Sequence, residues 1–172
     1  MQEADKRKPF KYDVDGYDNI TNAINDLLNQ YPGLLEGEQI KFSTLGEESG
    51  IAFYPVTGAA ISSEKVSVTG KVNQLCNYPF YIVYRTATES ANSKIDIKEF
   101  LDNLGRWLER QTIKIGSETY KLPGYPVLTD GRTITEIVRQ APAYLDYVSE
   151  NNVQNWVISF VFRYRNIFYR NK

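Results

Sequence analysis

The chain has 172 residues, with 20 basic and 21 acidic side chains, a formal charge of −1 and no histidine. A charge near zero gives no general attraction to nucleic acid or to an anionic membrane, and the lack of histidine removes the commonest general base and the usual zinc ligand. One cysteine, Cys76, excludes an internal disulfide framework and a multi-cysteine metal site. We expect an intracellular protein with no cofactor, no metal, no membrane span and no small-molecule substrate.

The first fifteen residues are rich in charge and show no apolar periodicity, and residues 6–9 read Lys-Arg-Lys-Pro. Such a segment has no core of its own. The sequence therefore predicts a mobile charged arm over residues 1–15 and a single folded domain over residues 16–172. Residues 13–18 have only a faint likeness to a calcium loop, because the glycine comes too early, so we expect no metal there.

Two stretches predict amphipathic helices, because their apolar residues recur at steps of three and four. The first begins with Asp18 as its cap and ends at Pro32-Gly33. The second runs over residues 96–111, with Asp96 as its cap and Ile95 packing across the first turn. Its apolar stripe predicts a buried face that covers a sheet. The stripe consists of Ile97, Phe100, Leu101, Leu104, Trp107 and Leu108.

Between and after the helices, apolar and polar residues alternate as in strands. Residues 39–45 and 51–56 flank a glycine-containing turn and predict a meander. Residues 112–130 are less regular and predict a surface excursion with a turn at Gly116-Ser117. Further strands are predicted at residues 65–69 and 80–84, in two pieces within residues 132–148, and at residues 156–165.

The last strand has the clearest alternation in the chain. Every second residue from Trp156 to Tyr164 is apolar and predicts a buried face, while Arg163 and Arg165 fall on the other face. Two helices and several strands without a repeated β-helix-β order predict an α+β fold with a mostly antiparallel sheet. We expect the residues after Tyr164 to be loosely held in the monomer.

The sequence has few groups that suit catalysis. Glu47 and Glu48 lie in a predicted turn, and two adjacent carboxylates without a partner motif are typical of a solvated loop. Cys76 lies in a strand-like stretch without basic neighbours, which predicts a buried, unreactive thiol. A glycine-rich phosphate loop is missing. We therefore expect that the protein is not an enzyme.

Basic and aromatic side chains are interleaved from Arg163 to Lys172. This pattern fits a strand end that docks on another subunit, since tyrosine and arginine are common at interfaces. It also fits a different class, a small nucleic-acid-binding module that contacts phosphates and stacks bases. Only four charges are involved, so we favour subunit docking and do not expect specific nucleic-acid binding. The candidate subunit or partner interface consists of Glu47, Glu48, Arg163, Arg165, Phe168, Tyr169 and Arg170.

Several short motifs follow one another in a recognisable order over about residues 20–169. They are Tyr31-Pro32, Ile40-Lys-Phe-Ser-Thr-Leu-Gly-Glu-Glu48, Pro55-Val56, Phe80-Tyr-Ile-Val-Tyr-Arg85, Phe100-Leu-Asp-Asn-Leu-Gly-Arg-Trp-Leu-Glu109, Leu122-Pro123 and Gly131-Arg132-Thr133. This order resembles the tail terminator or minor capsid proteins of phages and prophages of Gram-positive bacteria. The chain departs from that pattern in its charged arm and in a longer excursion over residues 112–125.

The resemblance implies an α+β subunit that closes into a ring, a hexamer, on the finished tail tube. Such a ring stops tube polymerisation and forms the head–tail joining surface. The implied partners are other copies of the chain, the tail tube protein and the head–tail connector proteins. The protein would occupy the host cytoplasm during assembly and the tail or neck of the virion afterwards. The alternative within the same class is a head–tail connector or completion protein of the neck.

Overall fold

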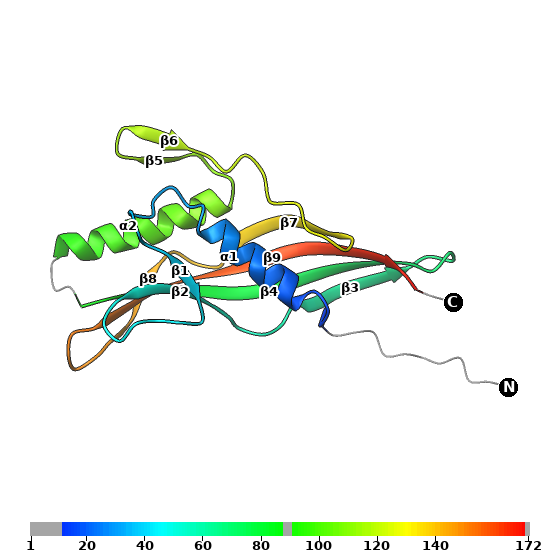
Figure 1. The fold of residues 1–172 in the computed structure, drawn as a ribbon, viewed down its shortest axis with the longest axis horizontal. Helices are drawn as coiled ribbons and strands as arrows, with labels where there is room; N and C mark the ends of the chain where they lie inside the picture. Colours follow the sequence, from blue (N-terminus) through cyan, green and yellow to red (C-terminus); the bar gives the residue numbers. More distant parts are fainter. Residues whose placement is uncertain (1–11, 88–90, 171–172) are drawn as a thin grey trace.

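A long antiparallel ribbon forms the axis of the molecule (Figure 1). The computed structural model describes residues 12–87 and 91–170. The ribbon consists of β4 (Lys71–Thr86) and β9 (Gln154–Tyr169), which pair over sixteen residues each. Every other strand of the main sheet joins one edge of this ribbon, directly or through β2.

Within the described residues the main sheet has seven strands and is mixed, although mostly antiparallel. The strand β2 (Gly50–Pro55) and the strand β3 (Ala60–Val66) pair with opposite halves of β4. On the other edge, β7 (Arg132–Arg139) and β8 (Tyr144–Val148) pair with opposite halves of β9. The ribbon thus has a β8 end, shared with β2, and a β3 end, shared with β7. The predicted α+β fold with a mostly antiparallel sheet is confirmed.

The predicted meander is wrong in one detail, because β1 (Ile40–Phe42) runs parallel to β2. The side chain of Asn29 donates a hydrogen bond to the carbonyl of Ile40 (3.0 Å) and accepts one from its amide (2.9 Å), which fixes the strand beside the end of the first helix. The intervening residues then return to the start of β2. A left-handed backbone at Ser43, with φ of 50°, begins this return.

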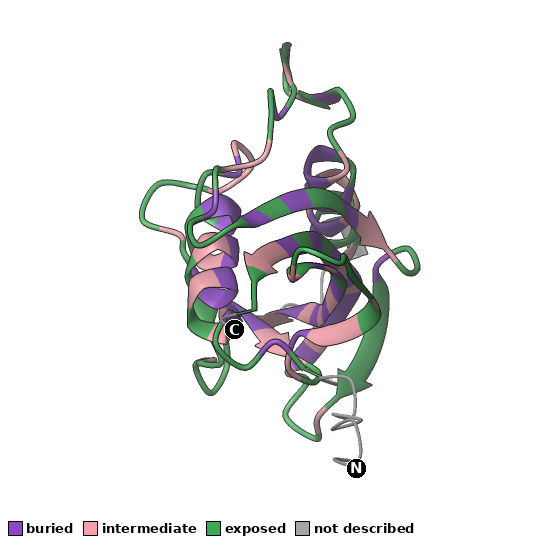
Figure 2. Cartoon of the chain, turned by 90° about the vertical axis from the view of Figure 1, so that its right-hand side faces the viewer, coloured by how far each residue is buried: buried purple, intermediate pink, exposed green. Residues whose placement is uncertain are grey.

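Both helices of the described chain, α1 (Tyr17–Leu28) and α2 (Ala91–Leu108), pack on the same core. Buried and exposed segments alternate along the helices and strands (Figure 2). The predicted stripe of α2 is confirmed, since five of its residues are buried and Phe100 is half-buried. The ring of Phe100 meets the rings of Tyr31 and Tyr84 edge-on, each at 5.3 Å between centroids. The buried members are Ile97, Leu101, Leu104, Trp107 and Leu108.

The predicted helix starts are wrong. The second helix begins by Ala91, so Asp96 lies inside it, and Ile95 is 63% exposed and does not pack across the first turn. The first helix has Gly16 at its cap position without a side-chain cap, and Asp18 lies within its first turn. At the first helix the expected cap at Asp18 is replaced by a different contact. The amide of Gly16 donates a hydrogen bond to the carboxylate of Asp13, which lies outside the helix.

The inner face of β9 is the centre of the core, as predicted. Every second residue from Trp156 to Tyr164 is buried, whereas Arg163 and Arg165 are exposed on the outer face. The ring of Phe160 stacks on Phe80 across the ribbon, with centroids 5.2 Å apart. Each buried side chain of this size contributes about 1.5–3 kcal/mol through apolar burial.

Residues 112–130 contain a small hairpin, β5 (Ile113–Ile115) and β6 (Glu118–Tyr120), that forms a sheet of its own. Gly116 turns the chain with φ of 62°. The hairpin projects from the body of the molecule (Figure 1). The predicted surface excursion is confirmed for the hairpin tip, but Ile113, Leu122 and Leu128 are buried and fix its base to the core.

The prediction of a loosely held segment at each end of the chain differs from the structure. Residues 1–11 lie outside the described residues, and within the rest of the predicted arm Asp13 is buried. After Tyr164 the chain continues in β9, paired on both sides up to Asn166 and with β4 up to Tyr169. Expecting this segment to be loosely held was therefore wrong, because backbone pairing on two edges outweighs its polar side chains. Residues 171–172 lie outside the described residues.

Candidate functional site

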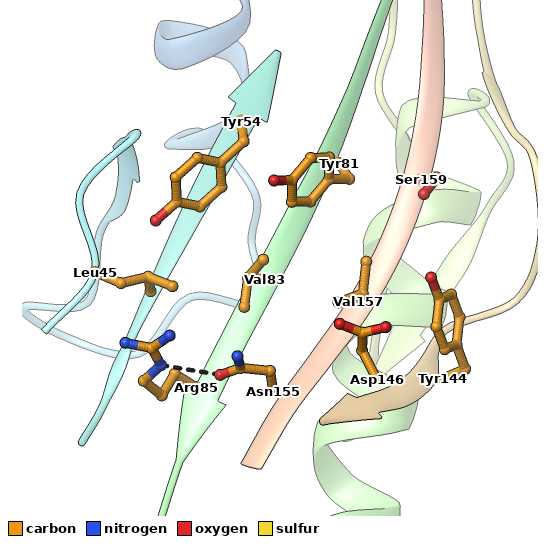
Figure 3. A pocket seen from close by; sticks show the side chains of 10 residues that line it. All are labelled: Leu45, Tyr54, Tyr81, Val83, Arg85, Tyr144, Asp146, Asn155, Val157 and Ser159. Atoms are coloured by element: carbon orange, nitrogen blue, oxygen red, sulfur yellow. Dashed lines mark hydrogen bonds between the residues drawn. The ribbon is translucent and has the colours of Figure 1, made fainter. Parts of the chain in front are cut away.

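An open groove of about 390 Å³ lies on the outer face of the sheet, at the β8 end (Figure 3). Its floor is formed by Val83 and Val157, which are opposite each other on the ribbon and are almost fully buried. One wall carries Tyr54 and Tyr81, whose rings stack at 5.4 Å. The groove therefore combines an apolar floor with aromatic hydroxyl groups, a composition that suits a protein segment or another polar-aromatic surface.

The strand β8 forms the opposite wall of the groove. In Figure 3, Tyr144 and Asp146 project from β8 beside Val157. The pairing of β8 with β9 is interrupted by a register shift between Leu145 and Tyr147. Such an irregularity re-aims the neighbouring side chains, so Asp146 lines the first groove while Tyr147 lines the next one.

Arg85 separates this groove from a second, adjacent cavity of about 350 Å³. Its guanidinium donates from Nε to Oδ1 of Asn155 at 2.9 Å and from Nη1 to the carbonyl of Gly46 at 3.0 Å. These two bonds hold the loop between β1 and β2 against the ribbon. Because Glu47 and Glu48 lie on that loop and line the second cavity together with Tyr147, the loop and β8 form one continuous surface.

The predicted interface residues divide between the two ends of the ribbon. Glu47 and Glu48 lie at the β8 end. The other five lie on or just after β9 at the β3 end, where Arg163 pairs with Glu136 at 2.5 Å and Arg170 with Glu64 at 2.7 Å. The structure thus does not bring the predicted set together as one patch. The five at the β3 end are Arg163, Arg165, Phe168, Tyr169 and Arg170.

The sequence did not indicate that β8 forms part of an exposed surface. All five of its residues are exposed, and its large apolar side chains are 40–58% exposed. One signal in the sequence could have indicated it: the strand-like run after Pro142 has apolar residues at consecutive positions. Such a strand has apolar side chains on both faces, so it has no polar face for the solvent. The apolar members are Tyr144, Leu145, Tyr147 and Val148.

A buried polar cluster at the β3 end ties the start of the described chain to the sheet. Arg132 donates two hydrogen bonds to the carboxylate of Asp13, at 2.8 and 2.9 Å, and the hydroxyl of Tyr164 donates a third at 2.6 Å. We call Asp13, Arg132 and Tyr164 the anchor cluster. Gly16 is required beside it, because a Cβ atom there would lie 2.2 Å from Oδ2 of Asp13. The cluster is therefore a structural anchor, because the carboxylate of Asp13 already accepts hydrogen bonds from Gly16, Arg132 and Tyr164.

The anchor cluster shifts the pKa values of its members. Burial alone would raise the pKa of Asp13, but the hydrogen bonds from Arg132 and Tyr164 and the charge of Arg132 outweigh it, so this pKa lies below its usual value. The hydrogen bond to Asp13 raises the pKa of Arg132. Burial, followed by the neighbouring carboxylate, raises the pKa of Tyr164. The cluster therefore holds an ionised pair and a neutral phenol.

Cys76 is buried next to the anchor cluster, as the sequence predicts. Burial raises the pKa of its thiol to about 11, so the thiol is protonated near neutral pH. Within residues 12–87 and 91–170, groups of three or more side chains that could hold a metal ion are absent. Over the same residues, neither helix combines the length and the hydrophobicity needed to span a bilayer.

No protein-family model matches the chain, and no curated protein sequence matches it either. The likeness to tail terminators thus depends on the short motifs alone.

Proposed function

We propose that this protein is a structural virion protein, a tail terminator that caps the tail tube as a ring, stops its polymerisation and forms the head–tail joining surface. The observation that supports the proposal most is the exposure of β8, whose large apolar side chains are 40–58% exposed in the subunit. An apolar strand at a sheet edge is a template for another chain. The order of sequence motifs favours a phage tail as the assembly to which that other chain belongs.

A ring subunit needs two different surfaces that fit one another on neighbouring copies. Contacts of this head-to-tail kind close into a ring when the rotation between subunits is right. The two ends of the ribbon differ in the required way, because the β8 end is apolar and acidic and the β3 end has arginines on its outer face. Arg165 has no ion-pair partner among the described residues and is available for such a contact.

The hairpin of β5 and β6 offers a further contact. A two-stranded hairpin by itself is marginally stable in water, and this one packs on the core through Ile113, Ile115 and Tyr120. The hairpin projects from the body of the molecule (Figure 1). Lys114, Glu118 and Thr119 are exposed on its strands, where a neighbouring subunit or the tube can meet them. This supports an assembly role more than a role for an isolated subunit.

Capping also follows from the physics of the tube. A tube built by stacking identical rings has a growing end with an unsatisfied face, and growth ends when a subunit matches that face and presents a different one outward. A ring that matches the rotational symmetry of the tube multiplies weak contacts through avidity. A single subunit then needs little affinity of its own for the tube protein.

Deletion of the gene, followed by electron microscopy of the lysate, tests the proposal. We expect overlong, headless tails beside filled, tailless heads. Tails of normal length that attach to heads, or a complete lack of tubes, would contradict the terminator function. Normal tails that accumulate unattached would instead support the connector function of the neck.

A further inference from the structure

The two adjacent cavities at the β8 end share Arg85 and Asn155, and we call them together the socket. Three carboxylates line the socket, and none of them has an ion-pair partner among the described residues. Arg85 supplies the guanidinium in its lining and is bound to uncharged oxygens. The described lining therefore has a net charge of −2, which favours a basic occupant. The carboxylates are those of Glu47, Glu48 and Asp146.

The outer face of the sheet has the opposite charge at the β3 end. Every second residue of β9 from Val157 to Arg165 points to this face, so Arg165 lies on the same face as the socket floor. Cross-strand neighbours also share a face. Four cations and one carboxylate lie on this part of the described face, which gives it a net charge of +3. They are Lys65, Lys71, Arg163, Arg165 and Glu136.

Arg165 is the cation best suited to a contact with the socket. It is exposed and has no ion-pair partner among the described residues. Its cross-strand neighbour on β4 is Leu75, an apolar side chain that is 41% exposed. A guanidinium binds carboxylates through paired hydrogen bonds and stacks on aromatic rings. Arg165 and Leu75, which we call the knob, thus match the carboxylates, tyrosines and valine floor of the socket.

The knob cannot fill the socket of its own subunit. Arg165 and Val157 lie eight residues apart on one extended strand, a separation of roughly 26 Å. This distance exceeds the reach of an arginine side chain, and both groups point away from the same face of one sheet. An occupant of the socket therefore comes from another molecule, and a second copy of the chain supplies a knob of the right chemistry.

Other occupants fit the socket less well. A nucleic acid would place phosphates against carboxylates. An uncharged surface would bury the carboxylates without a counter-charge, which costs free energy. Two sockets that faced each other would bring like charges together. Charge complementarity therefore favours the knob of a neighbouring copy.

We propose that Arg165 and Leu75 of one subunit dock into the socket of a neighbouring copy. The guanidinium lies between Asp146 and the ring of Tyr144, which project from β8 on the same side of the groove (Figure 3), and Leu75 covers the valine floor. Knob and socket are different surfaces, so each subunit can use both and the contact can repeat. The contact deepens the proposed function and rests on it for the head-to-tail closure of such contacts into a ring.

Docking also holds β8 in place. Among the described strands β8 pairs only with β9, through five residues and a register shift, so its amides are accessible through local opening. Contacts of the knob with Tyr144 and Asp146 oppose that opening. The backbone at Arg165 already lies between β4 and β7, so its protection changes little on docking.

Cross-linking between two full-length variants tests the contact directly. Thr133→Cys, exposed beside Arg165, is mixed with Asn151→Cys, exposed in the socket, and treated with a short bismaleimide. The buried Cys76 does not interfere. The matched control replaces the second variant with Ile95→Cys, an exposed residue of α2 on the other side of the sheet. We expect at least tenfold more covalent dimer in the first mixture, and equal yields would overturn the proposal.

Charge reversal provides an independent readout by sedimentation. Arg165→Glu and Asp146→Arg should each weaken self-association at least tenfold, because each places like charges together. The double variant exchanges the two charges and should recover part of the loss. The matched control is Arg106→Glu, an exposed change on α2 that should leave association intact. Unchanged association of Arg165→Glu, or losses that simply add in the double variant, would overturn the direct contact. Wild-type protein that stops at a dimer would overturn the head-to-tail arrangement.

The two proposals fail separately. If the Arg165→Glu protein still forms rings that cap tails, the knob contact is wrong and the terminator function stands. If the variants behave as expected but deletion of the gene leaves tails of normal length, the knob contact stands and the terminator function is wrong.

Discussion

The two ends of the β4–β9 ribbon are completed very differently. At the β3 end, charges meet charges, since Arg163 pairs with Glu136, Arg170 with Glu64, and Arg132 with the buried Asp13. At the β8 end, described carboxylates have no ion-pair partner, and all of β8 is exposed. At the β3 end three arginines are thus paired within the subunit and Arg165 is not, whereas the β8 end combines unpaired carboxylates with exposed apolar side chains.

This contrast shows that charge alone does not locate an interface. The basic and aromatic run at the end of β9 looks available in the sequence, yet two of its arginines are already paired and its backbone is bonded. The less conspicuous β8 has apolar side chains that are 40–58% exposed. Partners available within the fold therefore decide which residues are free to bind.

The largest effect is expected in the core that both ends share. Trp107→Ala should lower the free energy of unfolding by about 3–5 kcal/mol, because a large buried ring in contact with Tyr31 is removed. The matched control is Ile95→Ala on the same helix, an exposed site where the change should stay within about 0.5 kcal/mol. Urea unfolding measures both. An unchanged midpoint for Trp107→Ala would place this side chain outside the core.

The anchor cluster should be the next most sensitive place. Asp13→Asn leaves the buried guanidinium of Arg132 without its counter-charge and should cost about 3 kcal/mol. Asp15→Asn, two residues away and exposed, is the control and should change stability little. Equal behaviour of the two variants in urea unfolding would mean that residues 12–15 belong to a loose arm after all.

The same cluster predicts a pH dependence. The pKa of Asp13 is lower in the folded than in the unfolded protein, so its ionisation stabilises the fold fully above about pH 4 and ceases to do so as the pH falls through the folded-state value. Wild-type protein should therefore lose more stability than Asp13→Asn between about pH 5 and the acid limit. Parallel pH profiles of the two proteins in urea unfolding would contradict this account.

The smallest effect on stability is expected at β8. Tyr147→Ser should change the free energy of unfolding by no more than about 0.5 kcal/mol, because the side chain is exposed in the subunit. It should nevertheless weaken self-association, which Val68→Ser at the β3 end should leave intact. Sedimentation and urea unfolding of the same samples separate the two effects. A large loss of stability would show that Tyr147 serves the subunit's own core.

Periodicity predicted the parts of this fold that depend on one buried face. The stripe of α2 and the alternation of β9 required no knowledge of neighbours, because each side chain's burial follows from its own position. The sequence also pointed to two carboxylates that lie in the site, Glu47 and Glu48, although it grouped them with residues at the other end.

What the sequence could not supply depends on distant partners. Asp13 looked like part of a mobile arm, because its partners Arg132 and Tyr164 lie more than one hundred positions away. The start of α2 and the parallel pairing of β1 likewise follow from tertiary contacts that override local capping and turn signals. The exposure of β8 follows from the strand order, which no local pattern encodes.

The central claim is that the β8 end is completed by another copy of the chain. Hydrogen exchange of the full-length protein, measured over a concentration series that spans assembly, tests it most directly. We predict that the amides of residues 144–148 become at least tenfold better protected as the protein assembles, while those of residues 164–169, already paired in the subunit, change little. Protection of residues 144–148 that stays the same at every concentration would contradict the claim.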